Sequence, residues 1–337
     1  MASGLTKFGN DLYTGERSVP FIRMRRVWLT IAAILMLAAV AVPFIRGGGD
    51  FGAGFNFGIE FRGGSQFQVS DASSIKIEPA EDAVHSVVPD AVVHVTTVGT
   101  DGLRVQTDQL TDPQTQDVAD ALRDAYDTET VDDSFIGATW GADITRQALQ
   151  GLGIFLLAAA LLMAIYFRTW KMSAAAMLAL LHDLVITVGV YAATGFEITP
   201  AAMIGFLTIL GFSLYDTVVV FDKIRENTSE LGDDATRTFG ETVNLAVNQT
   251  LVRSINTGVV AALPVAAILF IGAVVLGAGT LRDIALSLLV GILIGTYSTI
   301  FIAAPLYSQL RENEPELQKR TKKVASTRAN SLSGAVR

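Results

Sequence analysis

The sequence contains no cysteine, only three histidines and few charged residues, which make up 17% of its 337 positions. Without cysteine the chain has no disulfide framework, no thiolate chemistry and no cysteine-ligated metal. Three histidines leave little for a metal site, so we expect neither a metal nor a cofactor. Soluble domains carry about 25% charged residues. The shortage here, with half of the residues apolar, indicates a membrane protein.

Six apolar runs are long enough to cross about 30 Å of hydrocarbon as helices. They cover approximately residues 27–45, 148–167, 173–195, 198–221, 257–278 and 283–307. The first run has one feature of a signal peptide, because Ala39-Val40-Ala41 resembles a cleavage site. Its extent to Ile45 and the 26 residues before it favour a retained helix. Under either interpretation, the segment that follows is translocated.

Lysines and arginines predict the orientation of the spans. They cluster before the first run and in every second connection after it, whereas the other connections are poor in them. The clustered residues are Arg23, Arg25, Arg26, Arg168, Lys171, Lys223, Arg225, Arg237 and Arg311. The positive-inside rule therefore puts both termini in the cytoplasm. Residues 1–26 form a cytoplasmic N-terminal segment on this prediction.

Residues 46–146 form a long acidic connection that must fold by itself. They include 6 lysines and arginines against 18 acidic residues, a net charge of −12, so the rest of the chain carries +4. Alternating strand patterns at 65–70, 92–98, 102–107 and 132–139 are interrupted by amphipathic stretches at 78–88 and 117–126. This β-α-β-β-α-β order, with Asp101-Gly102 as a turn signal, predicts a ferredoxin-like domain.

The predicted fold is a polytopic α-helical membrane protein with six transmembrane helices in a 1+5 plan and a ferredoxin-like α+β external domain between helices 1 and 2. Residues 147–310 form its five-helix transmembrane domain, with a cytoplasmic connection at 222–256. The polar tail, residues 311–337, is predicted to be cytoplasmic and disordered.

Asp216 is the strongest functional candidate, in the stretch GFSLYDTVVVFDKIREN at 211–227. A carboxylate in a spanning helix costs about 2.5–3.5 kcal/mol on insertion scales and faces protein or water. Ser213 lies one helical turn before it. A reversible ion-binding role and a buried structural ion pair are both compatible with this pattern.

Arg253 is the candidate partner of Asp216, at the entrance to the fifth predicted span. Gln249, Asn256 and Thr257 accompany it at helical spacing and form a polar stripe. A bridge between Asp216 and Arg253 would switch when the aspartate is protonated. An arginine that snorkels to lipid headgroups would show the same sequence pattern.

His182 and Asp183 are adjacent in the third span and point about 100° apart on a helix, so they cannot line one surface together. They form either a secondary proton relay or a packing pair. An intramembrane protease is disfavoured, because neither a second catalytic aspartate motif nor the expected serine-before-histidine order is present around Ser213. Gly291 and Gly295 form a small-residue helix-packing face in the sixth span.

Four stretches together resemble the smaller subunits of the SecD/SecF family of bacterial protein-export membrane proteins. They are FGIEFRGGSQFQV (57–69), LHDLVITVGVYA (181–192), GFSLYDTVVVFDKIREN (211–227) and NQTLVRSINTG (248–258), and the resemblance extends over about residues 20–310. It implies membership of the RND superfamily, whose members couple ion flow to the movement of external domains. It also implies that Asp216 and Arg253 take part in ion coupling, with protons or sodium as the ion.

The same resemblance implies the partners and the location. A six-span chain is half of the usual RND arrangement, so a pseudo-symmetric SecD subunit is expected, beside the SecYEG channel with SecA and a translocating precursor protein. The location implied is the bacterial inner (plasma) membrane, with the lipid bilayer as a further partner and no nucleic acid. Two rival functions remain: a non-transporting scaffold for SecD, and a stand-alone RND-type exporter of small solutes.

Overall fold

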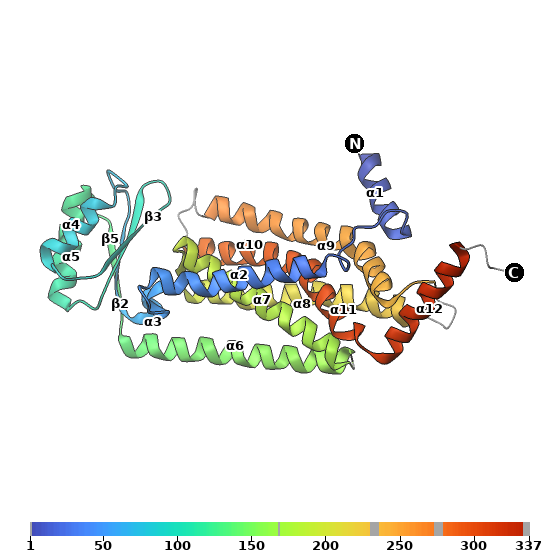
Figure 1. The fold of residues 1–337 in the computed structure, drawn as a ribbon. Coiled ribbons are helices and arrows are strands. Elements are labelled where there is room, and N and C mark those ends of the chain that lie inside the picture. Colours follow the sequence, from blue (N-terminus) through green and yellow to red (C-terminus); the bar gives the residue numbers. More distant parts are fainter. Residues whose placement is uncertain (1, 168, 230–235, 273–278, 333–337) are drawn as a thin grey trace.

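The computed structural model of the chain describes residues 2–167, 169–229, 236–272 and 279–332. Long helices form a bundle, and a smaller sheet domain lies at one end of it, while both termini lie at the opposite end (Figure 1). In the described residues, six helices are long and apolar enough to span a membrane: Arg25–Arg46, Thr139–Phe167, Trp170–Thr194, Pro200–Ser229, Phe239–Phe270 and Thr280–Glu312. The predicted class, a helical membrane protein with six spans, is therefore confirmed.

The helices that contribute to these spans are α2 (Arg25–Arg46), α6 (Ala138–Phe167), α7 (Trp170–Thr194), α8 (Pro200–Ser229), α9 (Phe239–Phe270) and α10 (Gly279–Ser298). The sixth span continues from α10 through a π-helical turn, Thr299–Ala303, into α11 (Ala304–Glu312). One spanning helix precedes the sheet domain in the chain and five follow it.

Four strands and two helices form the sheet domain: β2 (Gly64–Val69), α4 (Glu78–Val87), β3 (Val93–Val98), β4 (Gly102–Thr107), α5 (Asp112–Tyr126) and β5 (Val131–Ile136). Neighbouring strands are antiparallel in the order β3-β4-β2-β5, which is the split βαβ arrangement. The turn between β3 and β4 comprises residues 99–101, with Gly99 at a φ of 72°, so it includes Asp101 of the predicted Asp101-Gly102 signal.

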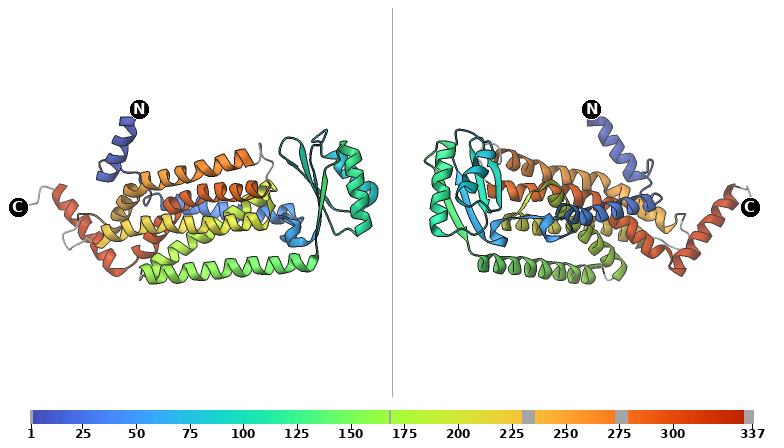
Figure 2. Two further views of the ribbon diagram at one scale, coloured as in Figure 1. Left: turned by 180° about the vertical axis from the view of Figure 1, so that it is seen from behind. Right: turned by 60° about the vertical axis from the view of Figure 1, so that its left-hand side comes forward.

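One face of this sheet is apolar and the other is polar, because successive strand residues point to opposite faces. Phe67, Val69, Leu103 and Val105 are fully buried in the core beneath α4 and α5. The two helices lie on the side of the sheet away from the bundle (Figures 1 and 2). The polar face therefore turns towards the bundle.

Short elements connect the sheet domain to the bundle: η1 (Gly52–Gly54), β1 (Asn56–Phe57), α3 (Ile59–Arg62) and β6 (Glu197–Ile198). β1 pairs in parallel with β6, which lies between α7 and α8. Gly63 and Gly64 have φ values of 80° and 143°, so the chain turns there into β2 through a backbone conformation that favours glycine.

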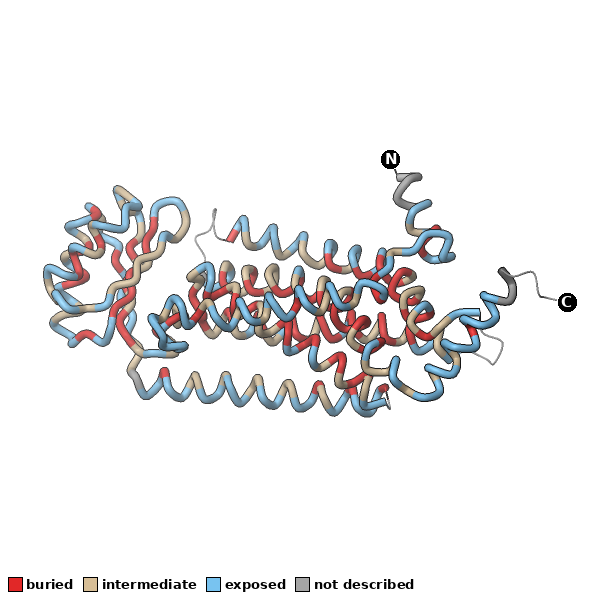
Figure 3. The backbone as a smooth tube through the Cα atoms, in the orientation of Figure 1, coloured by how far each residue is buried: buried red, intermediate tan, exposed pale blue. Residues whose placement is uncertain are grey.

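Burial divides the bundle into inner and outer helices (Figure 3). In the most apolar window of each span, α7 and α8 have half of their residues buried, whereas α2 and α6 have 11% and α9 has 17%. Gly291 allows close packing at the centre, since a Cβ there would lie 2.4 Å from Ile209 Cγ1 in α8. The predicted small-residue packing face therefore lies against α8.

The structure corrects the sequence-based boundaries at the termini and in the connection at 222–256. α8 continues to Ser229, and α9 begins at Phe239 with a capping box formed by Thr238 and Glu241, so much of that connection is helical. The tail that was predicted to be disordered contains α12 (Pro315–Leu332), and the N-terminal segment contains α1 (Ala2–Thr14). Two stretches lie outside the described residues: the last part of the predicted fifth span, 273–278, and the last part of the tail, 333–337.

Candidate functional site

Asp216 lies in the buried centre of the bundle, where its side chain meets α9 and the sixth span. Its residue exposure is 4%. The Ser254 hydroxyl of α9 donates a hydrogen bond of 3.0 Å to Asp216 Oδ1. The Thr299 side chain also interacts with the carboxylate, and its hydroxyl lies 3.2 Å from that of Thr217. Hydroxyl groups from α9 and the sixth span therefore contact this aspartate.

A π-helical turn occurs in the sixth span directly beside Asp216. It comprises Thr299–Ala303, and Thr299 is its first residue. π-helical turns within α-helices are rare and occur frequently at functional sites. The Thr299 hydroxyl lies on the face of this turn that packs on α8, 3.2 Å from the Thr217 hydroxyl.

A second buried polar cluster lies between α7, α8 and α10. Asp183 Oδ2 accepts a hydrogen bond from Ser213, one turn before Asp216, and Asp183 Oδ1 lies 3.4 Å from His182 Nδ1. The His182 ring lies 6.5 Å from the ring of Tyr297. His182 and Asp183 are therefore both buried but face different helices, as their adjacent positions require.

Two polar atoms of this second cluster have no hydrogen-bond partner among the described residues: His182 Nε2 and the Tyr297 hydroxyl. Buried polar groups in proteins are nearly always hydrogen-bonded, and exceptions mark strained or functional positions. The two clusters share α8, where Ser213 and Asp216 are three residues apart. A line of ionisable and hydroxyl side chains thus runs from α7 through α8 to α9.

The predicted partner of Asp216 takes a different position. Arg253 is exposed, and no ion pair within 4.0 Å joins it to an acid in the described part of the chain, although it is close enough to act electrostatically on Asp216. Asn256 is also exposed and Thr257 is half-buried. Gln249 accepts a hydrogen bond from Asn227 and donates one to the backbone oxygen of Tyr13, so it fastens α1 and the end of α8 to α9.

Sequence reasoning missed four residues of these clusters: Thr217, Ser254, Tyr297 and Thr299. Each carries a hydroxyl inside or beside an apolar run, which was the available signal. Ser and Thr side chains in apolar helices usually bond to the backbone of their own helix. Only the packing of α8 against α9 and the sixth span distinguishes these four from ordinary helix residues.

Glu197 forms a third buried site, where the sheet domain contacts the bundle. Gln106 of β4 donates a hydrogen bond of 2.7 Å to Glu197 Oε1, and Arg104 Nη1 lies 3.5 Å from Glu197 Oε2. The Glu197 side chain is 3% exposed. Breaking a buried ion pair by removing one partner typically costs about 3–5 kcal/mol. This contact therefore holds the polar face of the sheet on the β6 segment.

Glu60 of α3 lies in the same junction and has no hydrogen-bond partner for its buried Oε2 among the described groups. Burial, together with the negative charge of nearby Glu197, raises the pKa of Glu60 above its usual range. Asp283 of α10 contributes to this charge and accepts a hydrogen bond of 3.2 Å from Thr199. The junction therefore joins the sheet domain, the β6 segment and the start of α10.

The described residues contain no group of three or more His, Cys, Asp or Glu side chains arranged to hold a metal ion. The carboxylates at the junction are spread over α3, β6 and α10.

Comparisons with known proteins agree on one family. A model described as "Protein export membrane protein SecD/SecF, C-terminal" matches residues 117–313, and "SecD/SecF GG Motif" matches residues 51–70. Protein translocase subunit SecF of Streptomyces coelicolor is 42% identical over 330 residues, covering 97% of this chain and 86% of that protein. SecF of Rhodothermus marinus is 32% identical, covering 87% and 93%.

Solved structures indicate the same family. The crystal structure of SecDF from Thermus thermophilus, a translocon-associated membrane protein, matches with a TM-score of 0.72 at 28% identity, over 88% of this chain and 39% of that one. SecDF in a super-membrane-facing form matches at 28% identity with a TM-score of 0.57, over 91% and 40%. Since one family model covers more than half of the residues and close relatives match almost end to end, the chain belongs to the SecD/SecF family of protein-export membrane proteins.

Proposed function

We propose that this chain is an accessory subunit of bacterial protein export that couples inward flow of protons or sodium ions to movement of its sheet domain, together with a SecD subunit. The observation that carries the proposal is Asp216: a carboxylate buried at mid-bundle, hydrogen-bonded to Ser254 across a helix interface. Burying a charge in that position costs free energy, and such residues usually mark a pathway for ions.

Ion binding at Asp216 changes the packing of three helices in this mechanism. When Asp216 is charged, the hydroxyls of Ser254 and Thr299 stabilise it. When an ion neutralises it, those hydrogen bonds weaken, and α9 and the π-helical turn of the sixth span become free to shift on α8. In the ion-free state, the positive charge of Arg253 attracts the charged Asp216. Arg253 lies at the surface of the bundle in this structure.

The sixth span links Asp216 to the sheet domain. Its far end begins in α10 at Gly279, and Asp283 there bonds to Thr199, two residues from Glu197. Glu197 in turn holds Gln106 and Arg104 of the sheet. A shift of the sixth span at Thr299 would therefore be transmitted to the junction that fixes the orientation of the sheet domain.

The membrane potential is sufficient to drive this cycle. One charge that crosses 100 mV contributes about 2.3 kcal/mol. That energy is comparable with the cost of breaking a single buried hydrogen bond to a charged group, about 1.5–3 kcal/mol. Two ions would then supply enough energy to exchange the contacts around Asp216 in each cycle.

The proposed orientation places both termini in the cytoplasm and the sheet domain outside the inner membrane. The acidic sheet domain would meet the precursor as it leaves the SecYEG channel, which receives it from SecA. The weakly buried helices α2, α6 and α9 leave apolar faces for lipid and for SecD. The similarity to SecDF, of which this chain spans 39%, supports SecD as the partner.

The decisive experiment compares precursor release from energised vesicles that contain wild type, Asp216→Asn or Asp216→Glu, with complex assembly measured for each. Asp222→Asn is the matched control, because Asp222 lies in the same helix and its carboxylate accepts a hydrogen bond of 2.7 Å from the Tyr166 hydroxyl. We expect Asp216→Asn to assemble but to lose its dependence on the ion gradient, and Asp216→Glu to keep part of it.

Normal gradient dependence in an assembled Asp216→Asn complex would overturn the coupling proposal. The chain would then act as a scaffold that holds SecD in place, with Asp216 as a structural residue. Separate proton and sodium gradients in the same vesicles identify the ion, because only the coupled ion supports release by the wild type.

A further inference from the structure

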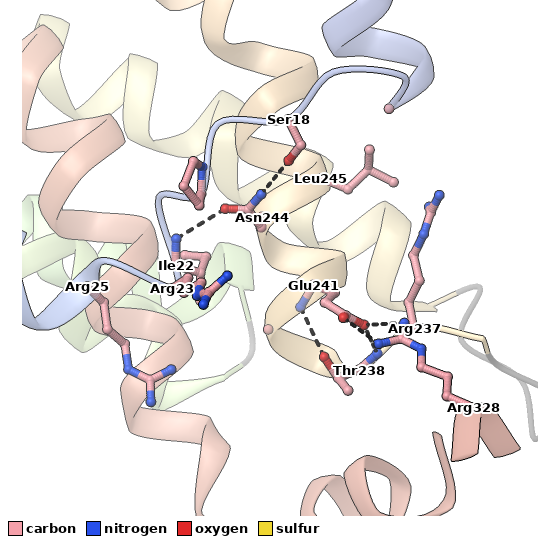
Figure 4. Close-up of a pocket in the computed structure, with 13 residues that line it drawn as sticks. Ser18, Ile22, Arg23, Arg25, Arg237, Thr238, Glu241, Asn244, Leu245 and Arg328 are labelled. Carbon is pink, nitrogen blue, oxygen red and sulfur yellow. Dashed lines mark hydrogen bonds and ion pairs between the residues drawn. The ribbon is translucent and has the colours of Figure 1, made fainter. Parts of the chain in front are cut away.

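A pocket of about 620 Å³ lies at the end of the bundle opposite the sheet domain. Its walls come from three parts of the chain: the segment between α1 and α2, the first turns of α9, and α12. The volume falls within the usual range of ligand pockets, about 300–1,000 Å³. Figure 4 shows Arg237 and Arg328 beside Glu241 at the start of α9, and Arg23 and Arg25 on the opposite side, on the segment that leads into α2.

Four arginines and one glutamate line this pocket: Arg23, Arg25, Arg237, Arg328 and Glu241. Glu241 is already engaged, because Arg328 donates two hydrogen bonds to its carboxylate, at 2.8 and 3.0 Å. Arg25 forms an ion pair with Glu312. Arg23 and Arg237 have no ion pair within 4.0 Å with any acid in the described residues. The pocket therefore has a positive excess that an anion would neutralise.

The frame of the pocket is fixed by buried contacts. Asn248 Oδ1 accepts a hydrogen bond of 2.8 Å from the backbone of Val19, and Asn244 Oδ1 accepts one of 3.1 Å from Ile22. The capping box of Thr238 and Glu241 holds the first turn of α9. The segments that carry Arg23 and Arg237 are thus positioned before any ligand arrives, which lowers the entropic cost of binding.

The surroundings identify the kind of anion. Arg25 is the first residue of the spanning helix α2, so the pocket lies at the level where lipid headgroups meet the helix ends. Pro20, Ile22 and Leu245 add apolar walls beside the arginines. Guanidinium groups match phosphate oxygens in geometry and bind them in a bidentate manner.

We infer that this pocket binds the phosphate headgroup of an anionic phospholipid, with Arg23 and Arg237 as its phosphate ligands. The site needs only that the chain is inserted in a membrane and is independent of ion coupling at Asp216. A bound lipid would bridge the N-terminal segment, α9 and α12, and would fasten these elements to the bilayer.

The test uses the full-length chain, delipidated in a neutral detergent and titrated with phosphatidylglycerol while native mass spectrometry counts bound copies. The pocket variant is Arg23→Gln with Arg237→Gln. The control variant is Arg26→Gln with Lys322→Gln, which removes the same charge at the same end from exposed positions outside the pocket. Because the pocket variant removes both phosphate ligands, it should bind at least about 5-fold more weakly than wild type.

We expect the control variant to bind within about twofold of wild type at one saturable site, because Arg26 and Lys322 are exposed and do not line the pocket. Equal losses in both double variants would show general surface attraction and would overturn the inference. Phosphatidylcholine and inorganic phosphate serve as further probes. Displacement of phosphatidylglycerol by inorganic phosphate at similar concentration would assign the pocket to a soluble phosphate and overturn the lipid assignment.

Discussion

The hydroxyl of Ser254 in α9 donates a hydrogen bond of 3.0 Å to the carboxylate of Asp216 in α8, while the neighbouring Arg253 is exposed at the surface of the bundle. The serine therefore makes the direct contact across this helix interface. Arg253 acts on Asp216 only through its charge. The separate positions of these two neighbours make their contributions separable by mutation.

Ser254→Ala should lower gradient-dependent precursor release about tenfold without preventing assembly. A hydrogen bond to a charged group contributes about 1.5 kcal/mol or more, which corresponds to about tenfold in an equilibrium. Thr250→Val is the control, because Thr250 is buried one turn earlier in α9 and, among the described residues, its hydroxyl bonds only to its own helix backbone. Equal release by Ser254→Ala and Thr250→Val would show that the Ser254 contact has no part in coupling.

Arg253→Gln should leave the thermal stability almost unchanged but lower gradient-dependent release. An exposed side chain usually changes stability by less than about 0.5 kcal/mol when replaced. Arg225→Gln, at an exposed arginine near the end of α8, is the control. Release and melting temperature are measured on the same preparations, and normal release by Arg253→Gln would show that Arg253 only anchors the helix to lipid headgroups.

The contact between the sheet domain and the bundle should weaken as pH rises above the usual titration range of a glutamate. The docked junction raises the pKa of Glu60 through burial and the charge of Glu197, so it binds the protonated form more tightly. The contact is thus strongest below the usual glutamate pKa and is lost as pH passes through the raised value.

Because the chain has no cysteine, spin labels on Thr97→Cys and Leu281→Cys would report the distance between the sheet domain and α10. Glu60→Gln should remove the pH dependence of that distance and keep the docked value. Glu129→Gln, at an exposed position of the sheet domain, should titrate like wild type. A pH response that survives in Glu60→Gln would assign the effect to another group.

Gly291→Ala should destabilise the bundle by about 1–3 kcal/mol, because the added Cβ would overlap Ile209 and force α8 and the sixth span apart. Gly211→Ala, in α8, has no atom within 4 Å of the added Cβ and should be neutral or slightly stabilising. Thermal unfolding in detergent provides the measurement. Equal melting temperatures for the two variants would contradict the packing role of Gly291.

The sequence by itself predicts the membrane class, the six spans and the exceptional position of Asp216. Apolar runs of about 20 residues and a lone carboxylate are local features that hydrophobic physics makes recognisable. The strand and helix pattern at 65–139 is also local, and the sheet in the structure has the corresponding order. The prediction of a disordered tail, which was made from its polar composition, was wrong. α12 is a polar helix with few apolar residues, and it packs on the start of α9.

Only the tertiary structure decides which side chains surround Asp216. Ser254 and Arg253 are adjacent in sequence and both polar, but the rotation of α9 buries one against α8 and exposes the other. Glu197, Arg104 and Gln106 come from segments separated by about ninety residues, so no local pattern joins them. The reason is physical: helix periodicity determines which residues share a face, whereas the packing of several helices determines what that face meets.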